Sequence, residues 1–181
     1  PCSSPTATQS LVELTQRMTT DEGPTYLAVM RAGVKDAIHI PGGVILLSRT
    51  MVEDYESPDV LAGYIIAEQT RRADRDPLRH VLESAGTMAT LRLLTTSRLP
   101  DGTLEAHAKQ LLTEDPAPVA AAPMLARFEA QSIPSSPYGY AIDVTGEQTL
   151  ELIEGDPLAG VAQMPVLPDA SWVRLQTICE G

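Results

Sequence analysis

The segment from His39 to Pro77 constrains the fold more than any other part of this 181-residue chain. A short extended run leads into Pro41-Gly42-Gly43, and a second apolar run, Val44 to Leu47, follows the paired glycines. Ser57 is a favourable N-cap residue, and Pro58 suits the first position of a helix. These signals predict strand, tight bend, strand and then a helix from Pro58 to about Ala73.

One acidic residue interrupts the apolar face of this helix. Val60, Leu61, Tyr64 and Ile65 fall on one stripe at helical spacing, and Glu68 continues that stripe. A carboxylate in such a position indicates either a structural ion pair or the remnant of a site. Arginines follow Glu68 at i+3 and i+4, which are good spacings for an ion pair within a helix.

The remaining patterns predict an α+β fold. Strands are expected over 25–30, 37–40 and 44–47, in a small three-stranded sheet with mostly antiparallel pairing. About five to six helices are expected to pack on this sheet. Helical patterns occur at 5–20, 78–95, 103–113, 123–133, 145–153 and 169–179.

The length predicts a single domain over 1–181. Its core is expected over about 25–155, with the helices 5–20 and 169–179 as extensions. Residues 134–140 are expected to form a loop, whose Tyr138 and Tyr140 either cover the core or contribute to a recognition surface. We favour the first alternative, in which the two tyrosines cover the core, since most such aromatic side chains are packed.

The charge balance excludes some partners. The formal net charge is −11, which disfavours nucleic acid and anionic membranes because both are polyanions. No apolar run approaches the roughly 20 residues of a membrane-spanning helix, so no transmembrane segment is expected.

The two cysteines, Cys2 and Cys179, lie at opposite ends of the chain. This placement favours a disulfide that ties the ends together over two separate thiols, since chain ends are often close in a domain. A lipid-anchored Cys2 is the less favoured alternative. A disulfide predicts an exported protein, periplasmic or extracellular, whose signal peptide has been removed.

The order of strand, PGG bend, strand and acid-bearing helix resembles the HtpX-like and BepA-like zinc metallopeptidases, a gluzincin family with a zincin fold. Asp36-Ala37 lies near the family's N-A pair, and Pro41-Gly42-Gly43 matches its PGG turn. The family's HExxH position is occupied by Ala67-Glu68-Gln69-Thr70-Arg71. The later ligand motif aligns best with residues 103–107, which places Thr103 at the third zinc ligand and His107 at the aspartate that supports the zinc ligands in the family.

These replacements remove the metal chemistry that the resemblance implies. In HExxH, two histidines at i and i+4 hold zinc, and the glutamate is the general base on the zinc-bound water. Ala67 has no ligand atom, Arg71 is a permanent cation, and Thr103 is a poor ligand. We therefore expect no zinc and no peptidase activity by the family's mechanism. Arg71 is expected to fold into the vacated metal position and pair with Glu68.

Two functions remain open. The first is a catalytically inactive binding or scaffolding module for a peptide or protein, with Gly42, Gly43, Val44, Ile45 and His107 lining a cleft or peptide-binding edge. The second is a hydrolase with a non-standard site that uses Glu68 as general base. His39, His80 and His107 are the only histidines, and ordinary surface or packed roles are expected for them.

Overall fold

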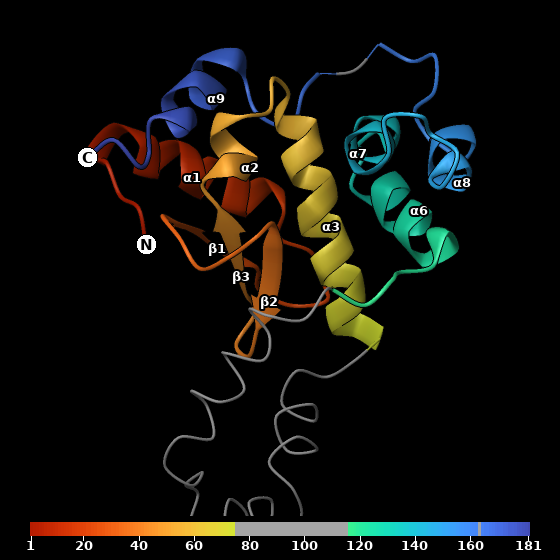
Figure 1. Cartoon of the computed structure of the whole chain (residues 1–181), viewed down its shortest axis with the longest axis horizontal. Coiled ribbons are helices and arrows are strands. Elements are labelled where there is room, and N and C mark those ends of the chain that lie inside the picture. The colour runs from red at the N-terminus through yellow and green to blue at the C-terminus, as the bar shows by residue number, and fades with distance from the viewer. Residues whose placement is uncertain (75–115, 163) are drawn as a thin grey trace, which may run out of the picture.

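The computed structural model describes residues 1–74, 116–162 and 164–181. These parts form a three-stranded sheet and seven helices, which confirms the α+β class. The helices predicted over 78–95 and 103–113 lie outside the described residues. Figure 1 shows the long helix α3 between the sheet and a group of shorter helices.

The sheet is mixed, and the prediction of mostly antiparallel pairing was wrong. It contains β1 (Tyr26–Met30), β2 (Ala37–Ile40) and β3 (Val44–Ser48) in the order β1-β3-β2. β2 and β3 form an antiparallel hairpin, whereas β1 pairs with β3 in parallel. The bend after β2 folds β3 back between the two earlier strands, so β1 and β2 never pair with each other.

The paired glycines make that bend possible. Gly42 and Gly43 have φ values of 92° and 78°, in the left-handed region that favours glycine. A Cβ on Gly43 would also overlap the carbonyl oxygen of Pro24. The Gly43 carbonyl accepts a 2.9 Å hydrogen bond from the Tyr26 N–H, which begins the parallel ladder. The bend therefore needs glycine both for its backbone angles and for the close approach of the chain before β1.

Helix α3 (Pro58–Asp74) is the central element of the fold. One side packs on β2 and on α2 (Thr50–Glu53), and the other packs on α6 (Ala121–Ala130) and α7 (Ser136–Ile142). The short helix α8 (Leu150–Glu154) packs on α6 and α7. Helix α3 therefore joins the sheet to the C-terminal helices, as Figure 1 shows.

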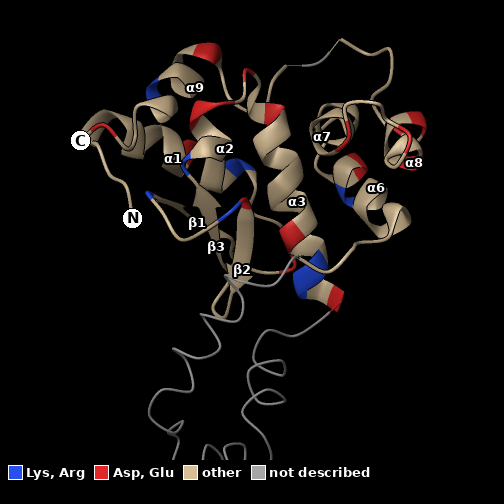
Figure 2. Cartoon of the chain, in the orientation of Figure 1, with Lys and Arg blue, Asp and Glu red and all other residues tan. Residues whose placement is uncertain are grey.

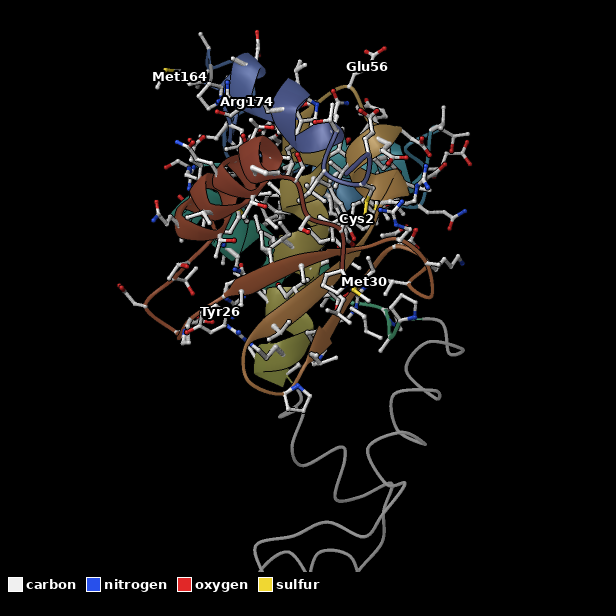
Figure 3. All side chains as sticks on the ribbon, turned by 90° about the vertical axis from the view of Figure 1, so that its left-hand side faces the viewer. Cys2, Tyr26, Met30, Glu56, Met164 and Arg174 are labelled. Atoms are coloured by element: carbon white, nitrogen blue, oxygen red, sulfur yellow. A yellow bond between two sulfur atoms is a disulfide. The ribbon has the colours of Figure 1, made fainter. Side chains whose placement is uncertain are left out.

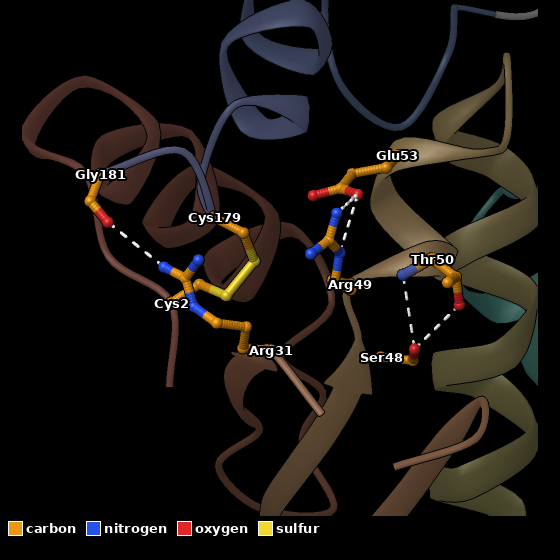
Figure 4. Close-up of a disulfide and its surroundings, with 8 residues drawn as sticks. All are labelled: Cys2, Arg31, Ser48, Arg49, Thr50, Glu53, Cys179 and Gly181. Carbon is orange, nitrogen blue, oxygen red and sulfur yellow. Dashed lines mark hydrogen bonds and ion pairs between the residues drawn. A yellow bond between two sulfur atoms is a disulfide. The ribbon is translucent and has the colours of Figure 1, made fainter. Parts of the chain in front are cut away.

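The two ends of the chain meet. Helices α1 (Pro5–Arg17) and α9 (Asp169–Gln176) pack on each other, and a disulfide joins Cys2 to Cys179 with a Cα–Cα distance of 4.7 Å. Figure 4 shows this bond beside Arg31, which donates a 3.2 Å hydrogen bond to the Gly181 carbonyl. The predicted disulfide is thus present. No helix among the described residues has both the length and the apolar character needed to cross a membrane.

Two predicted elements differ from the structure. Residues 136–142 form helix α7 and not a loop, with Tyr138 buried and Tyr140 half exposed. The helix predicted over 145–153 begins only at Leu150, because the Asp143 carboxylate organises the preceding residues into a turn. The Asp143 carboxylate accepts hydrogen bonds from the N–H groups of Thr145 and Gln148, at 3.0 and 2.8 Å.

Candidate functional site

Helix α3 positions the candidate site. The Asp59 N–H donates a 3.2 Å hydrogen bond to the Ser57 hydroxyl, as expected of an N-cap residue. Residues 60–70 of α3 are buried except for the half-buried Tyr64, because neighbours cover both sides. The helix is therefore enclosed and does not carry one apolar stripe. Figure 2 shows charged residues at the start of α3 and along its C-terminal part, with an uncharged stretch between them.

Both oxygens of the Glu68 carboxylate are engaged. The side chain is only 3% exposed. Oε1 forms an ion pair with the guanidinium of Arg71. Oε2 accepts a 3.1 Å hydrogen bond from the His39 backbone N–H and lies 2.7 Å from Nδ1 of the His39 ring. A buried carboxylate is costly unless it is paired, and these contacts supply the pairing.

The backbone bond from His39 follows from the pairing of the hairpin. The Ser48 N–H donates to the Asp36 carbonyl at 2.7 Å, so Asp36, Ile38 and Ile40 direct their backbone groups toward β3. The intervening residues, including His39, direct theirs away from β3. The Glu68 carboxylate therefore accepts a hydrogen bond from one of the backbone N–H groups that point outward from the β2 edge of the sheet.

Arg71 is held on two sides. Its Nε donates a 2.7 Å hydrogen bond to the Ala117 carbonyl, and its guanidinium reaches Glu68. Tyr138 lies nearby, with its ring 5.0 Å from that of Tyr64 in an edge-to-face arrangement. Burial raises the pKa of Tyr138 above its usual value and Arg71 opposes that rise, so the phenol stays neutral at neutral pH.

The residues at the positions that the resemblance aligned with zinc ligands do not fit a zinc ion. Ala67 is fully buried and belongs to the hydrophobic core. Arg71 brings a cation to Glu68, where a zinc ion would require neutral or anionic ligands. Thr103, the third position, lies outside the described residues, as do His80 and His107. Within residues 1–74, 116–162 and 164–181, no three His, Cys, Asp or Glu side chains gather into a group able to hold a metal.

The proposed peptide-binding edge requires correction. Val44 and Ile45 belong to β3, which is the central strand and is paired with β1 on one side and β2 on the other. No edge is free there for an added strand. The outer strands are also partly engaged: the Cys2 N–H donates to the Val29 carbonyl at 2.7 Å on β1, and Glu68 binds His39 on β2.

Sequence reasoning missed two groups. His39 was expected to play an ordinary role, although alternation in β2 already places it on the face opposite Ile38 and Ile40. Gln69 was not considered, yet its buried amide donates to the Met18 carbonyl at 2.6 Å and to the Thr25 hydroxyl at 3.2 Å. It also accepts a 3.0 Å hydrogen bond from Gln131, which ties α3 to the end of α6.

No protein-family model and no curated protein matches this chain.

Proposed function

We propose that this chain is a non-catalytic binding or scaffolding protein built on a core similar to the HtpX-like and BepA-like metallopeptidases. The observation that carries the proposal is the engagement of Glu68 by Arg71 and His39. A general base needs a free oxygen that can reach a water molecule beside the substrate. In this site one oxygen faces a guanidinium and the other faces two donors from one residue.

Two further observations support the proposal. The strand, glycine bend, strand and helix occur in the order that the resemblance implies, with Glu68 on the helix beside the hairpin. The Cys2–Cys179 disulfide suits a protein that acts in an oxidising compartment outside the cytoplasm. We therefore place the function in the periplasm or extracellular space, with a peptide or protein as the ligand.

A hydrolase is the second candidate, and the His39–Glu68 contact is the observation that favours it. The 2.7 Å contact from Nδ1 to a carboxylate is the arrangement that orients an imidazole for proton transfer. The His39 side chain is 17% exposed, so its ring reaches solvent more than Glu68 does. In such an enzyme His39 would accept the proton, and Glu68 would only position it.

A hydrolysis screen separates the two functions. The purified protein, Glu68→Gln and His39→Ala are assayed against mixed peptide and ester substrates. We expect no hydrolysis above background in any of the three. Turnover by the unmodified protein that both substitutions abolish would overturn the binding proposal and favour the hydrolase.

A further inference from the structure

Exposed apolar side chains gather where helices α7 and α8 meet. Tyr140 on α7 and Leu150 on α8 are 51% and 49% exposed. A Cβ on Gly146, in the turn between the two helices, would lie 3.3 Å from the Tyr140 ring and 2.9 Å from Cδ1 of Ile153. Ile153 follows Leu150 by three residues, so the two side chains are neighbours on α8. Tyr140, Leu150 and Ile153 therefore form one continuous surface, which we call the α7–α8 patch.

The charge around this patch is negative. Residues 128–173 contain no Lys, Arg or His and seven acidic residues, which are Glu129, Asp143, Glu147, Glu151, Glu154, Asp156 and Asp169. Glu147, Glu151 and Glu154 are exposed and lie in α8 or just before it. Among the described residues, none of these three carboxylates has an ion-pair partner. The negative charge beside the patch is therefore left uncompensated.

The elements that pack on α7 and α8 do not supply the missing cation. Helix α6 carries Arg127, whose side chain is 14% exposed and pairs with Glu22 at 2.6 Å. Helix α3 carries Arg71 and Arg72, which are bound to Glu68 and to a backbone carbonyl. Figure 2 shows acidic residues on α7 and α8 and the nearest basic residue on α6.

These two properties select the partner. The exposed apolar surface favours a partner with apolar side chains, because their contact removes apolar area from water. The acidic residues beside it attract lysine or arginine, and they repel nucleic acid, anionic membranes and a second copy of the same patch. Three side chains cover far less than the about 800 Å² that each partner buries in a stable interface, so the patch fits a short segment and not a whole domain.

We propose that the α7–α8 patch binds a short segment of a partner protein that carries one or two apolar side chains between lysines or arginines. The apolar side chains contact Tyr140, Leu150 and Ile153, and the cations face the carboxylates of α8. The inference rests on the proposed function, because it names a surface and a partner class for a chain that acts by binding. It uses none of the residues around Glu68.

The test uses a short synthetic peptide with two leucines between lysines. Its binding to the full chain is measured by calorimetry at low and at high salt. Two control peptides each lack one property: glutamates replace the lysines in the first, and glycines replace the leucines in the second.

Variants of the chain remove the same two properties from the patch. Tyr140→Ala/Leu150→Ala removes apolar surface, and Glu147→Gln/Glu151→Gln/Glu154→Gln removes charge. All five residues are exposed, so we expect both variants to fold, and their melting temperatures check this.

Matched controls change exposed residues elsewhere. Val173→Ala removes an apolar side chain that is 60% exposed on α9. Figure 3 looks onto α9, with Arg174 labelled, from the side of the molecule that lies away from α8 in Figure 1. Asp21→Asn/Asp54→Asn/Glu180→Gln removes three exposed charges outside α7 and α8, which keeps the net charge equal to that of the charge variant.

We expect the leucine–lysine peptide to bind and both control peptides to bind at least about tenfold more weakly. The two patch variants should each weaken binding by about tenfold, and their matched controls should change it by less than about twofold. High salt should weaken binding, because it screens the exposed carboxylates.

Three results would overturn the inference. They are absence of binding by the leucine–lysine peptide, equal weakening by the patch variants and their controls, and a free protein in which a second copy already covers the patch. Sedimentation of the unmodified protein detects that second copy. Each result leaves the proposed function standing, because only the hydrolysis screen addresses it.

Discussion

The backbone N–H of His39 donates a 3.1 Å hydrogen bond to the carboxylate of Glu68, which joins the edge of the sheet to helix α3. The same carboxylate oxygen meets the His39 ring, and the other oxygen meets Arg71. Glu68 thus has a structural role that its position on the helix alone does not reveal.

Arg71→Ala is expected to lower the free energy of unfolding by about 3 kcal/mol, because it leaves a buried carboxylate without its cation. Chemical denaturation measures the change. Arg72→Ala is the matched control, since among the described residues the hydrogen bond of its guanidinium is an exposed 3.1 Å bond to the Pro24 carbonyl. We expect it to cost less than about 1 kcal/mol. Equal costs for the two variants would show that the Glu68 pair does not stabilise the fold.

A double-mutant cycle isolates the pair itself. Glu68→Gln combined with Arg71→Ala should cost less than the sum of the two single changes, because the second substitution removes the unpaired charge that the first created. Both residues lie on α3 three positions apart, so direct coupling is expected. Strict additivity would mean that Arg71 stabilises the fold through contacts other than Glu68, such as its hydrogen bond to the Ala117 carbonyl and its interaction with Tyr138.

Gly63→Ala should force α3 and α7 apart. A Cβ at Gly63 would overlap the side chain of Tyr138, which the rings of Tyr64 and Phe128 hold in place. We expect a loss of about 2 to 3 kcal/mol in the free energy of unfolding. Gly139→Ala on α7 is the control, because its Cβ would lie 2.9 Å from the movable Cγ1 of Ile153. A Gly63→Ala protein as stable as the Gly139→Ala protein would contradict this packing.

The terminal disulfide should contribute strongly to stability. It closes a loop with a sequence separation of 177, for which the chain-entropy treatment gives about 5 kcal/mol. The Cys2→Ala/Cys179→Ala protein is compared with the unmodified protein in denaturant without reductant. The intact mass should also show that both thiols have lost their hydrogens. A mass with two free thiols, or equal stability of the two proteins, would refute the prediction.

Two aspartates should respond to pH in opposite ways. Burial raises the pKa of Asp59 above its usual 3.8, despite a 2.8 Å bond from the Val166 N–H. A raised carboxyl pKa favours the protonated native state, so Asp59 costs stability at neutral pH and the cost fades as the pH falls below the raised pKa. Asp59→Asn should therefore raise the melting temperature at pH 7, and this gain should shrink as the pH falls toward 3.8.

The pKa of Asp156 shifts in the opposite direction, below its usual value. Burial alone would raise its pKa, but hydrogen bonds from Ser136 and Leu158 outweigh burial and lower it. Its contribution to stability is then complete above pH 3.8 and is lost as the pH falls through the lowered pKa. Asp156→Asn should lower the melting temperature at pH 7. The same direction of change for both variants at pH 7 would contradict these assignments.

Several elements can be predicted from the chemistry of residues that are close together in the sequence. The Ser57-Pro58 start of α3 and the glycine bend at Gly42-Gly43 are indicated by local residue types, and both are confirmed. The same holds for the α+β class. The terminal disulfide followed from cysteine placement.

The remaining features of the fold and the site could not be predicted, because they depend on contacts between segments that are distant in the sequence. The insertion of β3 between β1 and β2 is a matter of long-range pairing, which alternation within a strand does not specify. The role of His39 depends on which residues of the β2–β3 hairpin form hydrogen bonds between the two strands. This pattern decides which backbone N–H groups point toward Glu68. The sequence predicts a loop over 134–140, whereas Pro137 lies in the first turn of α7, where proline is tolerated.

Arg71 and His39 engage Glu68 at the position that the proposed resemblance to metallopeptidases assigns to a zinc site. Elemental analysis of the purified protein after incubation with excess zinc and removal of the free ion tests it most directly, with Glu68→Gln measured in parallel. We predict far less than one zinc per chain in both proteins. One zinc per chain that Glu68→Gln abolishes would contradict the claim.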